Sequence, residues 1–331
     1  MKKRMILLIF FLVLLVVYGS MWLFSIKKYP VEYGISFSQT HAEFLGLDWR
    51  ETYRATLDEL HPKYIRIAAA WNSIERERGV FNFADVDWQM DEAAKRGIKV
   101  TMVVGQKAPR WPECHVPAWH TATGDPAQKD LFNYVGMIVE RYKKHAALER
   151  WQVENEPFIG FAFGDCLGYD RSVVDEEIKL VRNLDSGHPV VLTDSGELGR
   201  WMKASRAGDF FGTTLYRVVR TPRGHVIKYD FMPAAFYRWK AKILGIPMEK
   251  FFVAELQAEP WFMSGDPMST PLEEQEKTMN PDRLVKHLNY TERIGVSRAY
   301  LWGVEWWYFM KEKMGDERYW EIIQDKLAEK G

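Results

Sequence analysis

Two glutamates, Glu156 and Glu255, close short apolar runs that are typical of buried strands. Glu156 lies in Trp151-Gln-Val-Glu-Asn-Glu-Pro157, Glu255 lies in Phe251-Phe-Val-Ala-Glu-Leu-Gln257, and both are followed by residues that favour a loop. Parallel barrels carry their chemistry at the carboxyl ends of their strands. Two carboxyl groups on one such rim could protonate the leaving oxygen of a glycosidic bond and meet the positive charge that develops at the anomeric carbon.

The surroundings of the two glutamates predict the different protonation states that this chemistry requires. Glu156 stands between Asn155 and Pro157 and fits a proton donor, and the Asn155 amide could bind a sugar hydroxyl beside the reacting carbon. Glu255 follows Phe252-Val-Ala254 and fits an ionised nucleophile. The alternative is a pair of structural carboxylates bonded to the barrel rim.

Two residues from other predicted strands could keep Glu255 ionised. Arg66 is an isolated charge within Tyr64-Ile-Arg-Ile-Ala-Ala69, and Tyr216 ends the sixth expected strand. A guanidinium or hydroxyl donor to a carboxylate favours its charged form. For Arg66, a purely structural ion pair is the alternative interpretation.

The elements that must position these residues alternate in type along the chain. After Pro30, strand-like runs alternate with longer helical patterns, which indicates parallel βα units. We expect strands at 33–38, 64–69, 99–104, 150–153, 190–193, 210–216, 251–254 and 298–302. Helices are expected at 48–60, 85–96, 127–144, 170–184, 234–244, 281–294 and 319–329. Eight strands in this order predict a single α/β domain, a (β/α)8 TIM barrel over residues 29–331. A doubly wound open sheet is the alternative, but Gly34-Ile-Ser-Phe-Ser38 lacks its glycine-rich phosphate turn.

The N-terminus predicts a separate segment, residues 1–28. Residues 5–25 form an uncharged run of 21 residues, close to the ~20 that cross a bilayer as a helix. Three basic residues precede the run, and Lys27 and Lys28 follow it. We expect a transmembrane signal-anchor that places the catalytic domain outside the cytoplasm. The alternative is secretion after cleavage of a signal peptide.

Composition narrows the classes of partner. The chain carries 45 Lys and Arg against 45 Asp and Glu, and this balance argues against nucleic acid, which demands a basic excess. The two cysteines, Cys114 and Cys166, could form one disulfide in an oxidising compartment, and two unpaired thiols are an equally open alternative. Neither cysteine has a second Cys or His at zinc-site spacing, and His41 near Glu43 has no evident third ligand, so neither a metal nor another cofactor is expected.

Aromatic and amide side chains could bind the sugar itself. Indole rings cover the flat C–H faces of sugars, and seven of the 14 tryptophans follow expected strands: Trp71, Trp111, Trp119, Trp261, Trp302, Trp306 and Trp307. Trp302 ends the eighth strand and is the strongest candidate. Gln39 and Gln106 follow the first and third strands and could bond sugar hydroxyls. Ordinary packing of the loops is the alternative for each of these residues.

Together, these motifs resemble the retaining glycoside hydrolases of clan A, a superfamily of (β/α)8 barrels. In that clan an asparagine and the acid/base glutamate end the fourth strand, and the nucleophile glutamate ends the seventh, as Asn155-Glu156-Pro157 and Glu255 do here. Arg66, Tyr216 and Trp302 match the clan's second-strand arginine, sixth-strand aromatic and eighth-strand tryptophan. The resemblance begins near residue 31 and does not resolve one family, since Leu215 stands where some families carry a histidine.

The resemblance implies a retaining β-glycosidase that hydrolyses O-glycosidic bonds of oligo- or polysaccharides by double displacement. Glu156 is the expected acid and base and Glu255 the expected nucleophile. The expected substrate-binding residues are Asn155, Arg66, Tyr216, Trp302, Trp71, Gln39, Trp261 and Gln106. Two alternatives stay open: a glycan-binding or sensing barrel with weak or no catalysis, and a transglycosylase that uses the same residues.

Overall fold

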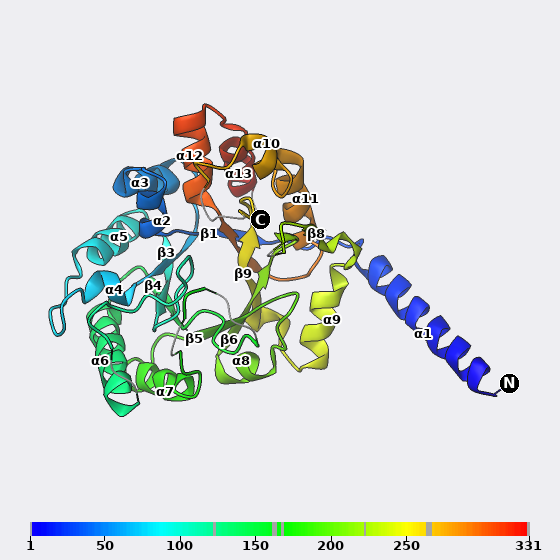
Figure 1. Cartoon of the computed structure of the whole chain (residues 1–331), viewed down its shortest axis with the longest axis horizontal. Helices are drawn as coiled ribbons and strands as arrows, with labels where there is room; N and C mark the ends of the chain where they lie inside the picture. The colour runs from blue at the N-terminus through cyan, green and yellow to red at the C-terminus, as the bar shows by residue number, and fades with distance from the viewer. Residues whose placement is uncertain are drawn as a thin grey trace.

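The structure is a computed structural model that describes residues 2–121, 124–160, 164–166, 169–221, 223–262 and 267–329. Its centre is a closed barrel of eight parallel strands in the order β1-β10-β9-β6-β5-β4-β3-β2 (Figure 1). These strands are β1 (Glu32–Ser36), β2 (Tyr64–Ala68), β3 (Lys99–Val104), β4 (Leu148–Val153), β5 (Val190–Asp194), β6 (Phe210–Leu215), β9 (Phe251–Gln257) and β10 (Arg298–Trp302). The predicted (β/α)8 barrel is confirmed, and β3 and β10 have the predicted bounds.

Helices surround the barrel, as Figure 1 shows. They are α2 (Gln39–Phe44), α3 (Trp49–Glu59), α4 (Trp71–Ile74), α5 (Ala84–Lys95), α6 (Asp125–Tyr142), α7 (Val174–Leu184), α8 (Met202–Ala207), α9 (Ala235–Ile243), α10 (Leu272–Glu276), α11 (Pro281–Thr291), α12 (Val304–Met314) and α13 (Arg318–Ala328). Two short 3-10 turns, η1 (Tyr229–Phe231) and η2 (Met248–Lys250), and an antiparallel hairpin of β7 (Val218–Arg220) and β8 (Val226–Lys228) complete the described elements. Of these, α2, α4, α8, α10, α12 and the hairpin were not predicted from the sequence.

Side-chain alternation along the strands builds two apolar layers. Between the barrel and its helices lies the main core, which contains Phe251 and Val253 of β9. A smaller cluster inside the barrel contains Phe252, Ala254 and Tyr300. Gly34 makes room for the inner layer, because a Cβ at that position would lie 2.9 Å from the Tyr300 ring and 2.8 Å from the Tyr64 carbonyl oxygen.

The prediction that Glu255 follows its strand is wrong, because β9 continues to Gln257. The strand also contains a register shift: Val253 pairs with Thr213 and Glu255 pairs with Thr214, so the ladder skips Ala254. Such a bulge breaks the alternation of side chains and re-aims the residue that follows it. Glu255 therefore faces the barrel interior on the same side as its neighbour Ala254.

Helix α1 (Lys2–Phe24) has no buried residue and projects away from the barrel beside α9 (Figure 1). Among the described residues, α1 is the one helix that is long enough and apolar enough to cross a membrane. A signal sequence would have the same properties. Its last turn is tied to the barrel: the Ala235 N–H donates to Ser25 Oγ over 2.8 Å, and Arg238 Nη2 donates to the Phe24 carbonyl oxygen over 2.7 Å.

Candidate active site

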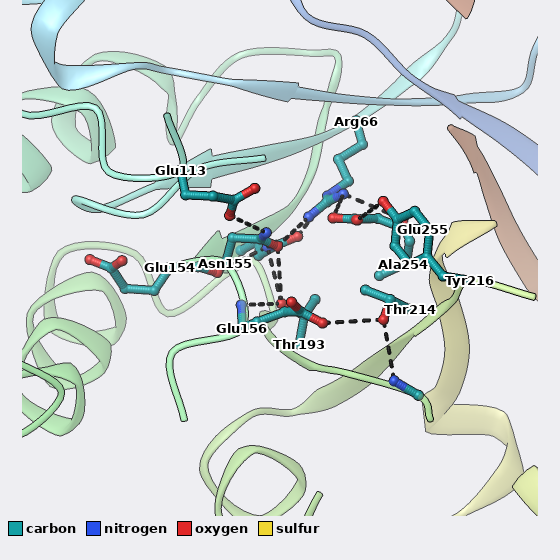
Figure 2. A network of polar contacts seen from close by, with 12 residues as sticks. Arg66, Glu113, Glu154, Asn155, Glu156, Thr193, Thr214, Tyr216, Ala254 and Glu255 are labelled. Atoms are coloured by element: carbon teal, nitrogen blue, oxygen red, sulfur yellow. Dashed lines mark hydrogen bonds and ion pairs between the residues drawn. The ribbon is translucent and has the colours of Figure 1, made fainter. Parts of the chain in front are cut away.

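Glu255 is held by two donors on the carboxyl-terminal rim of the barrel (Figure 2). Arg66 Nη1 from β2 donates to Glu255 Oε1 over 2.9 Å, and the Tyr216 hydroxyl, directly after β6, donates to Oε2 over 2.8 Å. Arg66 and Glu255 are 2% and 4% exposed, so this ion pair is largely shielded from water. A guanidinium and a hydroxyl donating to its two oxygens favour the ionised carboxylate.

The same guanidinium organises the end of β4. Arg66 Nε donates to Gln152 Oε1 over 2.8 Å, and Nη2 donates to Asn155 Oδ1 over 2.9 Å. One arginine thus links β2, β4 and β9, and it fixes Asn155 relative to Glu255. The structure brings together the predicted residues Arg66, Asn155, Tyr216 and Glu255.

Glu156 faces the same space from the opposite side. Its backbone has the left-handed φ of 44°, and its N–H donates to Thr193 Oγ1 over 2.9 Å. The Thr214 hydroxyl donates to Glu156 Oε1 over 3.2 Å, and Thr214 is the strand partner of Glu255. Both carboxyl groups therefore converge on one region at the rim, as Figure 2 shows.

The surroundings of Glu156 and Glu255 differ in their charges. Burial, followed by the charges of Glu255 and Glu113, raises the pKa of Glu156 well above its ordinary value. No arginine bonds Glu156 among the described residues, whereas Arg66 pairs with Glu255. Burial thus favours the protonated form of Glu156, whereas Glu255 is paired with a cation, and an acid and a nucleophile need such different surroundings.

A third carboxyl group, Glu113, lies at the site and was not predicted. Asn155 Nδ2 donates to Glu113 Oε2 over 3.4 Å, and the residue is buried. Burial raises the pKa of Glu113 to about 8, and Glu255 adds to the rise. The sequence carries no local signal for this role, because Glu113 belongs to a loop that the tertiary fold places against β4.

The loop that carries Glu113 is fastened by a disulfide. Cys114 bonds Cys166 with an S–S distance of 2.05 Å and a Cα–Cα distance of 5.1 Å. The structure forms this bridge, one of the two alternatives that the sequence left open. The bridge connects the segment after β3 to the segment after β4, and both segments border the site.

Trp302 is positioned by a second ionic cluster. The Arg110 guanidinium lies 4.1 Å from the centre of the Trp302 ring, and it pairs with Glu259 and, over 2.6 Å, with Glu305. Within the described residues, His41, Glu259 and Glu305 are the group whose ligand atoms lie close enough to hold a metal, within 4.8 Å of one another. Arg110 supplies positive charge to both carboxylates of this group and lies over the Trp302 ring.

A cavity lies beside the carboxyl pair, toward β1, β2 and β3. Its lining includes Gln39, Arg66, Arg76, Asp85 and Trp302 but neither Glu156 nor Glu255. Gln39 is fixed there, because its Nε2 donates to Asp85 over 3.0 Å and to Glu43 over 3.1 Å. The cavity therefore extends the site away from the reacting groups.

The remaining predicted residues lie at different depths. Trp261 packs edge-on against Tyr216, with ring centres 5.5 Å apart, and so borders the site. Gln106 is half-buried, and its backbone N–H donates to Glu154 over 2.7 Å. The structure does not bring Trp71 to the site: its ring is fully buried, stacks 5.4 Å from Tyr134 and donates its N–H to Glu75 over 2.7 Å.

The prediction that Trp306 and Trp307 lie on the catalytic rim is wrong. Both are fully buried in α12, a helix that is apolar on most faces. Their N–H groups bond Gln275 and the Ala258 carbonyl inside the protein. Their role is packing of the barrel end.

Comparison with known proteins gives partial matches in sequence. The model of Glycosyl hydrolase family 10 matches residues 50–169. Mannan endo-1,4-beta-mannosidase A of Aspergillus aculeatus is 29% identical over 126 residues, which are 34% of this chain and 31% of that protein. The chain thus spans about a third of the length of this curated relative.

Solved structures share the fold over most of the chain. GH5_18 from Streptomyces cattleya in complex with GlcNAc has a TM-score of 0.60 at 14% identity, covering 83% of this chain and 71% of that chain. Native xylanase 10B from Thermotoga maritima has a TM-score of 0.58 at 13% identity, covering 94% and 99%. At such identities the likeness shows the barrel fold alone. With the family-model match and the mannosidase relative, the findings support a clan A glycoside hydrolase, and they do not resolve a single family within that clan.

Proposed function

We propose that the chain is a retaining glycoside hydrolase that cleaves O-glycosidic bonds of oligo- or polysaccharides by double displacement. The observation that carries the proposal is the pair of carboxyl groups that face one space in different surroundings. Arg66 and Tyr216 donate to the Glu255 carboxylate, and burial raises the pKa of Glu156 well above its ordinary value. The matched glycosyl hydrolase family model supports the same reaction class.

In the first step, Glu255 Oε attacks the anomeric carbon while Glu156 gives its proton to the leaving oxygen. The bond to the leaving group breaks, and a glycosyl ester with Glu255 forms. Glu255 thereby loses its charge. Because that charge is one cause of the raised pKa of Glu156, esterification lowers the pKa of Glu156 and prepares it to act as a base.

In the second step, Glu156 takes a proton from water, and the water oxygen attacks the anomeric carbon. The ester bond breaks, Glu255 regains its charge and the sugar leaves with its original configuration. Attack by the hydroxyl of another sugar instead of water would give transglycosylation through the same residues.

Asn155 and Trp302 complete the binding of the reacting sugar in this proposal. The Asn155 amide is fixed by Arg66 beside the nucleophile, and the Trp302 ring is fixed by Arg110. The neighbouring cavity, with Gln39 and Trp302 in its lining, accepts sugar units beyond the reacting one.

We further propose that residues 1–28 anchor the protein in a membrane and that residues 29–331 form the catalytic domain outside the cytoplasm. The exposed apolar helix α1 and the disulfide, which persists in oxidising compartments, support this location. Secretion after cleavage of the helix is the alternative. N-terminal sequencing of the protein recovered both from the membrane fraction and from the secreted fraction separates the two.

The test uses the full chain in detergent with aryl β-glycosides and with mannan and xylan. Wild-type activity is expected to give the retained anomer by proton NMR. Glu255→Ala should lose nearly all turnover, and azide should restore it with an inverted glycosyl azide. Glu156→Ala should slow poor leaving groups far more than activated aryl glycosides.

Glu92→Ala is the matched control, since Glu92 is a buried glutamate that accepts from Lys95 and Arg96 rather than from the site. It should keep its activity wherever it is folded. An inverted initial product, or full activity of Glu255→Ala, would refute the double displacement. Glycan binding without turnover in the folded wild type would favour a binding module.

A further inference from the structure

We propose that Glu113 is a positioning residue of this site: it orients the Asn155 amide, and its charge keeps the proton on Glu156 as the pH rises. The inference rests on the proposed function, in which Glu156 must stay protonated for the first step. It assigns a task to a buried carboxyl group that the two-glutamate mechanism leaves unused.

The first argument is the set of bonds around Asn155. Its Oδ1 accepts from Arg66 over 2.9 Å and from Gln152 and Thr193 over 3.3 Å each. With the carbonyl oxygen so occupied, the amide nitrogen must point the other way. The acceptor on that side is Glu113 Oε2, at 3.4 Å. Glu113 therefore reinforces, from the nitrogen side, the orientation of the Asn155 amide that these three donors favour.

The second argument is that the fold holds Glu113 firmly in an unusual backbone conformation. Glu113 has a φ of 73°, which favours glycine, and its carbonyl oxygen accepts from the Ala108 N–H over 2.9 Å. The next residue is Cys114, bridged to Cys166. Gly164 packs directly against the glutamate, because a Cβ there would lie 2.5 Å from Glu113 Cβ and Cγ. Backbone strain of this kind persists where the surroundings over-determine it and often marks a functional position.

The third argument is electrostatic. The charged groups that face Glu113 are Lys107 and Arg66, which favour its ionisation, and Glu255, which opposes it. Burial is the largest influence and brings the pKa of Glu113 to about 8. The pKa of Glu156 is also raised by burial first, then by Glu255 and Glu113, with Lys107 acting against the rise and Asp194 adding to it.

The titrations of Glu113 and Glu156 are therefore coupled. As the pH rises, ionisation of Glu113 places a negative charge beside Glu156 and opposes loss of the second proton. Glu113 thus extends the range in which Glu156 can act as an acid toward alkaline pH, and the Asn155 bond is kept because a carboxyl group accepts in either state.

Two variants separate charge from orientation. Glu113→Gln keeps an acceptor for Asn155 and removes the charge. It should keep the plateau of kcat/KM within about threefold and move the alkaline limb toward lower pH by about half a unit to one unit. Glu113→Ala removes both and should also lower the plateau about three- to tenfold, the value of one lost hydrogen bond.

Glu92→Gln is the control, because this buried glutamate bonds Lys95 and Arg96 and is not among the groups that act on Glu156. Its alkaline limb should coincide with that of the wild type. An unmoved limb in a folded, active Glu113→Gln protein would overturn the inference and leave the proposed function standing.

A second measurement does not need turnover. Carbon NMR of glutamate carboxyls, with the Glu156 signal assigned by Glu156→Gln, should show the titration of Glu156 at lower pH in Glu113→Gln than in the wild type. An unchanged titration overturns the role of Glu113. An inactive wild type with the expected NMR shift would instead sink the proposed hydrolysis alone.

Discussion

Removal of the Tyr216 hydroxyl tests whether this group holds the Glu255 carboxylate in place. Tyr216→Phe removes one oxygen atom that donates to Glu255 Oε2 over 2.8 Å, and it keeps the ring that packs against Trp261. A hydrogen bond to a charged group contributes about 1.5–3 kcal/mol. Since 1.36 kcal/mol corresponds to a tenfold rate, kcat/KM should fall about 10- to 150-fold.

Tyr142→Phe is a closely matched control for this change. The Tyr142 hydroxyl also donates to a carboxylate, Asp87, over 2.8 Å, and the residue is also shielded from water, but it lies outside the site. Both variants should lose some thermal stability, and Tyr216→Phe alone should lose activity on an activated aryl glycoside. Equal activity of the two folded variants would refute the view that Tyr216 acts on the nucleophile.

Two further predictions concern stability. Glu154 and Glu177 form a buried carboxyl pair: burial raises the pKa of Glu154 to about 7, and burial and the Glu154 charge raise that of Glu177 well above its ordinary value. Raised folded-state pKa values give stability that is fully present below about pH 4–5 and is lost as the pH rises from there through the folded-state pKa, about 7 for Glu154. Glu177→Gln should therefore hold its Tm better than the wild type between pH 6 and 9; parallel Tm curves would contradict this. Removing the bridge with Cys114→Ser and Cys166→Ser, which are 52 residues apart, should cost about 2–4 kcal/mol of unfolding free energy in denaturant titration. Unchanged stability of the double variant would show that packing alone fastens the loop.

The barrel was predictable because each strand is a short apolar run followed by a loop and a helical pattern. Strand-end chemistry was predictable for the same reason, since Glu156, Arg66 and Tyr216 stand at recognisable positions. The inward direction of the Glu255 side chain could not be predicted in this way. It depends on the bulge at Ala254, which is set by the strands that pair with β9 and has no local signal in the sequence.

The errors concern residues whose direction is set by tertiary packing. The segment after β10 reads as a tryptophan-rich loop, but it forms α12 and buries Trp306 and Trp307, because the end of the barrel needs an apolar cover. Trp71 starts the short helix α4, which turns its ring toward Tyr134 instead of the rim. Glu113 was missed because its place depends on a left-handed backbone and a distant cysteine.

The junction between α1 and the barrel limits where the catalytic domain can work. Phe24 and Ser25 are bonded to Arg238 and Ala235, so no free tether separates the helix from the folded body. With α1 in a bilayer, as proposed, the barrel cannot swing outward to search for distant chains. Its substrates would then be glycans that come close to the lipid surface, and a soluble version that begins after Ser25 would leave the Arg238 guanidinium without one of its acceptors.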